Sequence, residues 1–159
     1  MIKLRNFKIG DEDSLWEVFY TSVHMVCSNN YTEEQINAWA PKDLEPRVWI
    51  SKIRSLKPFV AITNSKIIGY SDVQDDGLID HFFVHGEFQN RGVGTSLMSE
   101  IFNRGARKKI LYSEVSHTAK PFFQKHGFKV VKEQTVNIRD VQLSNNLMEC
   151  RNHHTKCSN

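Results

Sequence analysis

A glycine-rich loop between a predicted strand and a predicted helix holds the residues with the clearest chemical potential. Residues 84–95 read Val-His-Gly-Glu-Phe-Gln-Asn-Arg-Gly-Val-Gly-Thr. A helix start leaves about four N–H groups without intrahelical partners, and with the helix dipole they attract anions. Gly92 and Gly94 let a phosphate approach closely, and Arg91 adds paired donors. The loop therefore predicts a pyrophosphate site, with a plain glycine-rich helix start as the alternative.

Two familiar phosphate motifs do not fit this loop. Leu97 stands where the third glycine of a dinucleotide-binding fingerprint belongs, and the loop is longer than that tight turn. No Lys-Ser or Lys-Thr pair follows Gly92 or Gly94, as a P-loop would require. Neither motif accounts for the predicted anion site.

The elements that must position this loop follow from hydrophobic periodicity. A helix is predicted after Asp11, as its cap, with an apolar stripe ending at Val26, and further helices start near Thr32 and at Pro46. Helical patterns also cover residues 92–109 and 118–126, and strand patterns cover residues 2–7, 59–62, 67–74, 78–84, 110–115, 128–133 and 141–150. Strands 78–84 and 110–115 with the helix between them predict a βαβ unit of parallel strands.

Two motifs in this order resemble the GNAT family of N-acetyltransferases. Gln89-x-x-Gly92-x-Gly94 is similar to the family's pyrophosphate loop, and Ala119-x-x-Phe122-Phe123-x-x-x-Gly127-Phe128 is similar to a second family pattern. The resemblance spans most of the chain. It implies an α/β, single-domain GNAT-like fold: a mixed central sheet of about seven strands, helices on both faces, and two parallel strands splayed around the cofactor. We expect an N-acetyltransferase domain at residues 1–151 and a disordered tail at 152–159.

The resemblance also implies an acetyl-CoA site. Backbone groups of residues 89–95 would hold the pyrophosphate, and residues 82–84 would run beside the pantetheine arm and offer an N–H to the thioester carbonyl. The cofactor-binding residues so implied are Phe82, Phe83, Val84, Gln89, Asn90, Arg91, Gly92, Val93, Gly94, Thr95, Ser116 and Phe123.

The proton donor is open because the sequence departs from the family pattern. Phe123 replaces a Tyr that usually protonates the leaving thiolate, and Ser116 stands where Asn is frequent. Tyr112, Ser116, His117 or water are the remaining candidates, since a thiolate of pKa near 8.5 is a tolerable leaving group.

An amine nucleophile must also lose a proton, so the site needs a base. Alternation places Asp80 on the same strand face as Phe82 and Val84, which makes Asp80 the first candidate. Glu114 on the neighbouring parallel strand is the second. Each has a plain structural alternative as a solvated or ion-paired carboxylate.

The amine acceptor site is less defined. Tyr31, Trp39 and His24 are candidate substrate contacts because they lie in the N-terminal helical region, where the family builds its acceptor pocket. Aromatic residues at helical spacing are more often packing residues.

Composition excludes several other classes. The formal charge is +3, but residues 1–150 hold 19 of the 21 basic and all 18 acidic residues, which disfavours nucleic-acid binding. No apolar run indicates a membrane segment or export signal, and an odd cysteine count indicates a reducing, cytoplasmic setting. Cys150-x-x-His153-His154-x-x-Cys157 has zinc-ligand types but lies in a polar tail, so no metal is predicted.

The sequence thus predicts a cytoplasmic enzyme that transfers acetyl from acetyl-CoA to a primary amine, by direct attack in a ternary complex. The alternatives are a non-catalytic acyl-CoA-binding module and, less favoured, a nucleic-acid or partner-binding domain. The acceptor is expected to be a small-molecule or peptide amine, but the sequence does not identify it. A homodimer is compatible with the resemblance, and the sequence does not decide the oligomeric state.

Overall fold

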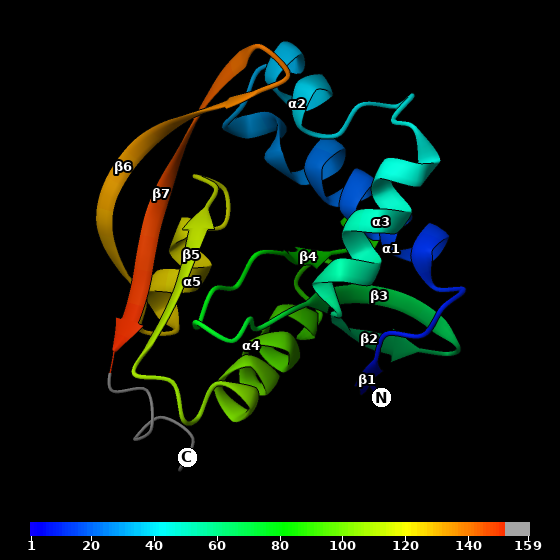
Figure 1. Ribbon diagram of the computed structural model, residues 1–159, viewed down its shortest axis with the longest axis vertical. Coiled ribbons are helices and arrows are strands. Elements are labelled where there is room, and N and C mark those ends of the chain that lie inside the picture. Colours follow the sequence, from blue (N-terminus) through cyan, green and yellow to red (C-terminus); the bar gives the residue numbers. More distant parts are fainter. Residues whose placement is uncertain (152–159) are drawn as a thin grey trace.

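The computed structural model describes residues 1–151, and the expected tail at 152–159 lies outside them (Figure 1). Turns of π and 3₁₀ type occupy Ser22–Val26, Cys27–Asn29 and Gly86–Phe88. The helices are α1 (Glu12–Thr21), α2 (Glu33–Trp39), α3 (Pro46–Leu56), α4 (Val93–Arg104) and α5 (Lys120–Lys125). The strands are β1 (Lys3–Asn6), β2 (Phe59–Thr63), β3 (Lys66–Ser71), β4 (Phe82–Val84), β5 (Ile110–Val115), β6 (Lys129–Ile138) and β7 (Val141–Arg151).

Within residues 1–151 the sheet consists of two parts, which strand pairing joins at one isolated bridge. One part has four strands in the order β1-β2-β3-β4, and the other has three in the order β5-β7-β6, all antiparallel to their neighbours. A parallel bridge between Leu78 and Tyr112 joins them, and Figure 1 shows the two parts diverging from there. The mixed sheet with splayed parallel strands is confirmed.

Both faces of the four-stranded part are buried against helices. Successive strand residues point to opposite faces, so Val60 and Tyr70 pack with residues of α1 and α3. Phe59 and Ile68 pack on the other face with residues of α4. Helices on both faces are therefore confirmed, and α4 is held close to the strand from which the glycine-rich loop departs.

Several predicted element starts are confirmed, and α1 also begins directly after Asp11 as predicted, but without the expected side-chain cap. Thr32 and Gln35 form a reciprocal capping box at the start of α2, and Pro46 occupies the first turn of α3. Asp11 does not cap α1 through its side chain, because its carboxylate binds the Arg5 guanidinium at 2.7 and 3.0 Å. The apolar stripe beyond α1 continues as a π-helical turn rather than as α-helix.

Four predicted boundaries differ from the structure by three residues or more. The strand predicted over 67–74 ends at Ser71, because the chain then turns and Gln74 N–H donates to Leu78 O. The helix predicted over 92–109 ends at Arg104, because the chain turns at Gly105, where a Cβ would lie 2.7 Å from Leu111 Cδ2. The strand predicted over 128–133 extends to Ile138 because its pairing with β7 continues to the turn. The strand predicted over 78–84 is wrong for residues 78–81, whose N–H groups donate to Asp76, Tyr112 and Asp72 rather than to β3.

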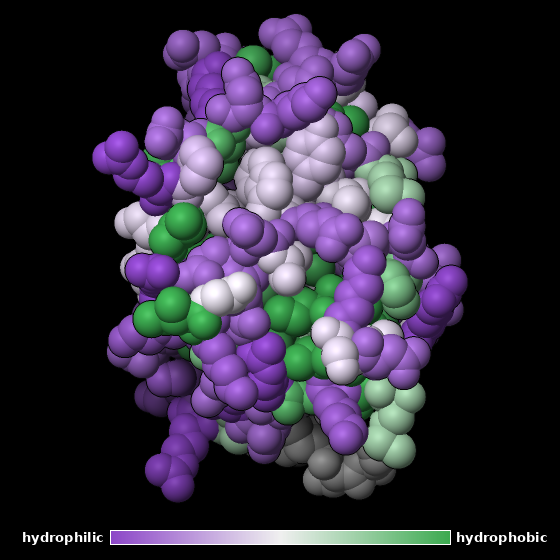
Figure 2. All heavy atoms as spheres, turned by 90° about the vertical axis from the view of Figure 1, so that its right-hand side faces the viewer, coloured by the Kyte–Doolittle hydropathy of each residue, from purple (hydrophilic) through white to green (hydrophobic). Residues whose placement is uncertain are grey.

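Figure 2 shows the face at the right of Figure 1, where hydrophilic side chains surround a smaller hydrophobic area. This pattern agrees with α3, which buries Trp49, Ile53 and Leu56 and exposes the rest of its surface. Within residues 1–151, no helix is long and apolar enough to cross a membrane.

Candidate active site

The segment that leads into β4 contacts β5 at residues 77–79, and the two strands diverge after that. Ile79 N–H donates to Tyr112 O at 2.8 Å, and the Ser113 hydroxyl donates to Ile79 O at 2.7 Å. Beyond this point β4 pairs with β3, and β5 pairs with β7. The separation leaves one edge of β4 without a neighbouring strand.

That edge presents backbone donors. In an antiparallel ladder, opposed residues alternate between hydrogen-bonded and non-bonded pairs. His85 N–H donates to Ile68 O at 2.8 Å, so the Phe83–Tyr70 pair is hydrogen-bonded and the N–H groups of Phe82 and Val84 point away from β3. Val84 O points the same way and accepts the Gln89 side-chain amide at 2.9 Å. Two N–H donors therefore face the gap between β4 and β5.

The start of α4 lies beside this gap. Gly92 precedes the helix with a φ of 83°, and the first α-helical bond of this turn runs from Ser96 N–H to Gly92 O. The N–H groups of Val93, Gly94 and Thr95 precede that bond and point out of the helix end. A Cβ at Gly94 would lie 3.1 Å from the Phe122 ring, so glycine lets helix and ring approach closely. The predicted anion site thus has its donors in place.

A cavity of about 480 Å³ connects the β4 edge with the α4 start. Ten of the predicted cofactor residues line it: Phe82, Phe83, Val84, Gln89, Asn90, Gly92, Val93, Gly94, Thr95 and Ser116. The other two lie elsewhere. The Arg91 guanidinium stacks over the Phe88 ring at 5.1 Å, and Phe123 is only 2% exposed among Phe82, Phe122 and Phe128.

A second cavity, of about 650 Å³, lies on the other side of β4, and Trp39, Phe83 and Ser116 border both. The predicted residues Tyr31, Trp39, Asp80, Tyr112 and Glu114 line it, together with residues that sequence analysis missed: Phe19, His81, Asn137, Arg139, Ser144 and Asn145 among them. His24 does not line it, because its ring stacks on Tyr20 and its Nε2 contacts Ala40 O at 2.7 Å. Aromatic walls and carboxylates suit a cationic amine.

The base candidates are both in this second cavity. The Asp80 carboxylate pairs with Lys52 Nζ at 2.6 Å, and Glu114 accepts a hydrogen bond from Gln134 Nε2 at 3.0 Å. Asp80 is not on a strand, so its orientation does not come from the strand alternation that predicted it.

The three side chains that could donate a proton to the thiolate differ in their hydrogen bonds and in their positions. The Tyr112 hydroxyl is bonded to Asp76, and His117 is bonded to Ser144 and Asn146. Ser116 lines both cavities, and its hydroxyl oxygen accepts Ala119 N–H at 3.1 Å. Of the three, Ser116 is the one that borders both cavities.

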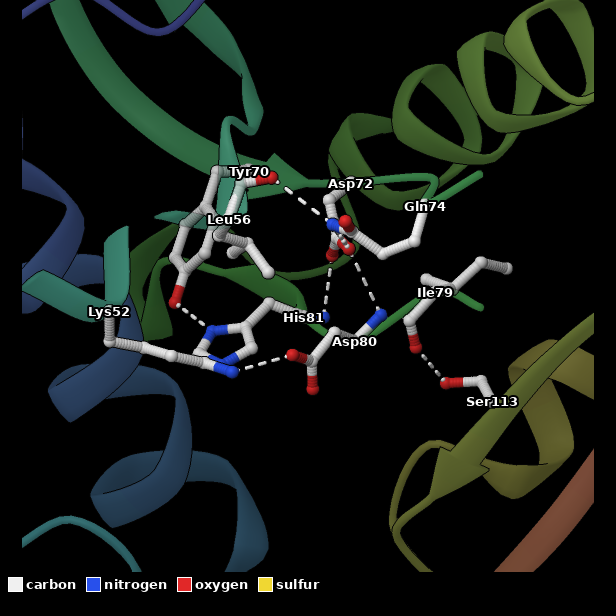
Figure 3. Close-up of polar contacts among 9 residues, drawn as sticks. All are labelled: Lys52, Leu56, Tyr70, Asp72, Gln74, Ile79, Asp80, His81 and Ser113. Atoms are coloured by element: carbon white, nitrogen blue, oxygen red, sulfur yellow. Dashed lines mark hydrogen bonds and ion pairs between the residues drawn. The ribbon is translucent and has the colours of Figure 1, made fainter. Parts of the chain in front are cut away.

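A polar cluster behind Asp80 carries shifted pKa values (Figure 3). Burial raises the pKa of the Asp72 carboxyl to about 6, although three hydrogen bonds to it act in the opposite direction. Desolvation lowers the pKa of His81 to about 4, so the imidazole is neutral at pH 7, and its Nδ1 lies 2.9 Å from the Tyr70 hydroxyl. Sequence analysis missed Asp72; a charged residue following the apolar run of β3 was the available signal.

Within residues 1–151, no group of His, Cys, Asp or Glu residues could hold a metal ion. Cys150, from the terminal Cys/His pattern, is buried in β7, and the other residues of that pattern lie outside the described part.

The structure thus combines a splayed α/β sheet, a glycine-rich helix start with outward-pointing N–H groups, and an adjoining cavity lined by aromatic and charged side chains. A model of the acetyltransferase (GNAT) domain matches residues 27–142. The chain is 34% identical over 153 residues to the uncharacterized N-acetyltransferase YafP of Escherichia coli K12, covering 96% of this chain and 98% of that protein. The chain belongs to the GNAT family of acetyltransferases.

Solved structures show the same fold. A GCN5-related N-acetyltransferase from Rhodopseudomonas palustris superposes with a TM-score of 0.89 at 26% identity, over 94% of both chains. The PaiA N-acetyltransferase of Thermoplasma acidophilum, in complex with coenzyme A, gives a TM-score of 0.69 at 21% identity, over 95% of this chain and 99% of that one.

Proposed function

We propose that this protein transfers an acetyl group from acetyl-CoA to a primary amine by direct attack in a ternary complex. One observation carries the proposal: the β4 edge, with its Phe82 and Val84 N–H donors, lies between a phosphate-binding helix start and a separate aromatic, acidic pocket. The arrangement suits a thioester lying along β4 with an amine approaching from the second cavity.

Each part of the chain has a role in this proposal. The α4 N–H groups and the 89–92 loop bind the pyrophosphate. The β4 N–H groups donate to the carbonyl oxygen as it gains negative charge during attack, a stabilisation that is commonly a large part of catalysis. Asp80 accepts the amine proton, with Glu114 as the second candidate, and Ser116 is the side chain best placed to donate a proton to the departing thiolate.

Ligand binding is the first test. At 100 times its dissociation constant, acetyl-CoA stabilises the fold by about 2.7 kcal/mol, which raises the Tm of a domain this size by about 5–10 °C. NAD and ATP serve as controls. A shift with acetyl-CoA alone supports the site, whereas no shift at millimolar acetyl-CoA contradicts it.

The base assignment is tested separately, on an amine that a CoA-release screen identifies. Asp80→Asn is expected to lower kcat/KM for the amine about 100-fold at pH 7, the usual scale for losing a general base, and less at pH 10, where free amine is abundant. Glu114→Gln is the paired variant, and Asp13→Asn, an exposed acid on α1, is the control. A larger loss in Glu114→Gln would transfer the role to Glu114.

A second candidate is an acyl-CoA-binding module without catalysis. The observation that favours it is the buried Phe123 ring, which has no hydroxyl to offer the thiolate. This candidate predicts an acetyl-CoA shift without CoA release from any amine. A large gain of activity in Phe123→Tyr would indicate a lost acid, and no gain would indicate chemistry that does not use this position.

For the substrate, we propose a small-molecule or peptide amine. We propose a cytoplasmic location from the cysteine usage: Cys27 and Cys150 are buried in separate hydrophobic clusters.

A further inference from the structure

A buried carboxylate lies directly behind the candidate base. Asp72 follows β3 and is 1% exposed, although acidic residues are rarely buried unless they are paired. Its Oδ1 accepts His81 N–H at 2.7 Å, and its Oδ2 accepts Asp80 N–H at 3.2 Å and Gln74 Nε2–H at 2.7 Å (Figure 3). Each of these three donors is an uncharged N–H.

These bonds lie where the two parts of the sheet separate. Ile79 N–H donates to Tyr112 O in β5, whereas the next two N–H groups along the chain donate to Asp72. Regular pairing with β3 starts only at Phe82, opposite Ser71. The Asp72 carboxylate therefore accepts the two N–H groups that a neighbouring strand would otherwise bind. The chain separates from β5 at these two residues, just before β4 begins.

The two residues so held, Asp80 and His81, both line the second cavity. They do so although they are consecutive and would point to opposite faces of a regular strand. Asp80 is further fixed by Lys52 on α3, and His81 by the Tyr70 hydroxyl. Gln74, bound to Asp72, also donates to Leu56 O at the end of α3, which connects the cluster to the helix that carries Lys52.

We propose that Asp72 is a positioning residue of the acceptor site: its ionised carboxylate fixes the backbone of Asp80 and His81 so that both side chains face the amine. The kinetic consequences of this inference rest on the proposed function. The hydrogen bonds to Asp72 can be tested without any activity. Asp72 touches neither substrate directly; it acts through the two residues it holds.

The ionised form suits these contacts best, because a carboxylate has acceptor lone pairs on both oxygens and carries no donor of its own. A protonated carboxyl, or an asparagine, places a donor opposite one of the N–H groups. The charged and titratable groups around Asp72 are Tyr70, Asp80 and His81, with Lys52 reaching it through Asp80. Since burial raises the pKa of Asp72 to about 6, its hydrogen bonds to the backbone of Asp80 and His81 weaken as the pH falls through that value.

The test compares Asp72→Asn with Asp75→Asn, an exposed carboxylate in the same loop. Without substrates, amide hydrogen exchange by NMR is expected to speed up at Asp80 or His81 by about tenfold or more in Asp72→Asn, the scale of one lost hydrogen bond to a charged group. Asp75→Asn is expected to leave both amides unchanged. Unchanged protection in Asp72→Asn overturns the proposal.

Kinetics provide the readout that a purely structural role would not move. With an accepted amine, Asp72→Asn is expected to lower kcat/KM for the amine by about tenfold or more while KM for acetyl-CoA stays within about twofold, and to remove an acidic limb near pH 6 from the wild-type profile. A proportional loss in both substrates overturns the proposal. A wild type that transfers no acetyl group refutes the proposed function instead, and the exchange data still decide the hydrogen bonds.

If Asp72→Asn does not fold, the wild type alone decides. Its Asp72 carboxyl carbon and the amides of Asp80 and His81 are then titrated by NMR. A shared midpoint near 6 supports the proposal, and amide shifts that do not follow the carboxyl overturn it.

Discussion

Replacing Tyr31 by phenylalanine removes a hydroxyl that connects the two sides of the cleft. This hydroxyl donates to Ser144 O in β7 at 2.7 Å and accepts His117 N–H, after β5, at 3.0 Å. Tyr31 itself precedes α2 and is 8% exposed in the core on the N-terminal side. Strand pairing joins the two parts of the sheet only at Leu78–Tyr112 within residues 1–151. The two Tyr31 bonds add a second connection, because Tyr31 packs in the core of the four-stranded part and its hydroxyl binds the three-stranded part.

The magnitude follows from what is left behind. The phenylalanine ring of the variant would keep the packing but leave a carbonyl and an N–H without this partner, at a cost of about 2 kcal/mol within the usual range of about 1–3 for such groups. For a domain of this size that lowers Tm by about 4–8 °C. KM for the amine is expected to rise, because the two lost hydrogen bonds hold in place a ring that lines the second cavity.

The assay is urea unfolding with thermal unfolding as a second probe. Tyr20→Phe is the matched control, because the Tyr20 ring also stacks on a histidine but its hydroxyl makes no hydrogen bond within residues 1–151. We expect Tyr20→Phe to match the wild type within about 0.5 kcal/mol, as substitutions away from such features usually do. If the free energy of unfolding of Tyr31→Phe also matches that of the wild type, the two hydrogen bonds of the Tyr31 hydroxyl do not stabilise the fold, and the reasoning is refuted.

Two further substitutions test the fold that positions the site. Gly69→Ala in β3 is expected to destabilise by about 1–3 kcal/mol in urea unfolding, because its Cβ would lie 2.9 Å from Val93 Cγ1, and this overpacking exceeds the gain of about 0.5–1 kcal/mol from removing a strand glycine. A stabilised Gly69→Ala would show that α4 does not press on β3. Arg5→Gln tests the pairing with Asp11, whose pKa the Arg5 guanidinium lowers. A lowered pKa stabilises the fold above the ordinary value of 3.8, and this stability is lost as the pH falls through the folded value. At pH 7, Arg5→Gln should therefore be less stable than the wild type. Between about pH 5 and pH 2, the free energy of unfolding from urea titrations should fall less in Arg5→Gln than in the wild type. Equal acid sensitivity in both proteins would contradict this.

Local sequence features were enough to predict the elements whose structure depends on residues close together in the chain. The capping box at Thr32, Pro46 in the first turn of α3 and the glycine-rich start of α4 depend on residues within a few positions of each other. The same holds for most of the predicted cofactor residues, because a loop and one strand edge supply them in sequence order. These parts of the fold, and the residues that line the first cavity, were therefore accessible from the chain alone.

The acceptor side depended on contacts between distant residues. Asp80 was assigned to a strand face, but the Asp72 carboxylate takes its N–H and ends the strand there, an interaction that no local pattern encodes. Arg139 reaches the second cavity only because the β6–β7 turn packs over α2, where its guanidinium donates to Ala38 O at 2.7 Å. Tyr112 pointed to the site by position, yet its hydroxyl is directed to Asp76 by the turn that precedes Leu78.

The sequence by itself therefore determined the order of the elements and the glycine-rich start of α4, because these follow from short-range periodicity and backbone chemistry, and its two motifs carried the resemblance to the family. Only the tertiary structure decided where β4 separates from β5, which side chains meet in the second cavity and which carboxylate is buried behind them. Those features arise from packing and hydrogen bonds between segments far apart in the chain, and burial, rather than residue type, sets the pKa of Asp72.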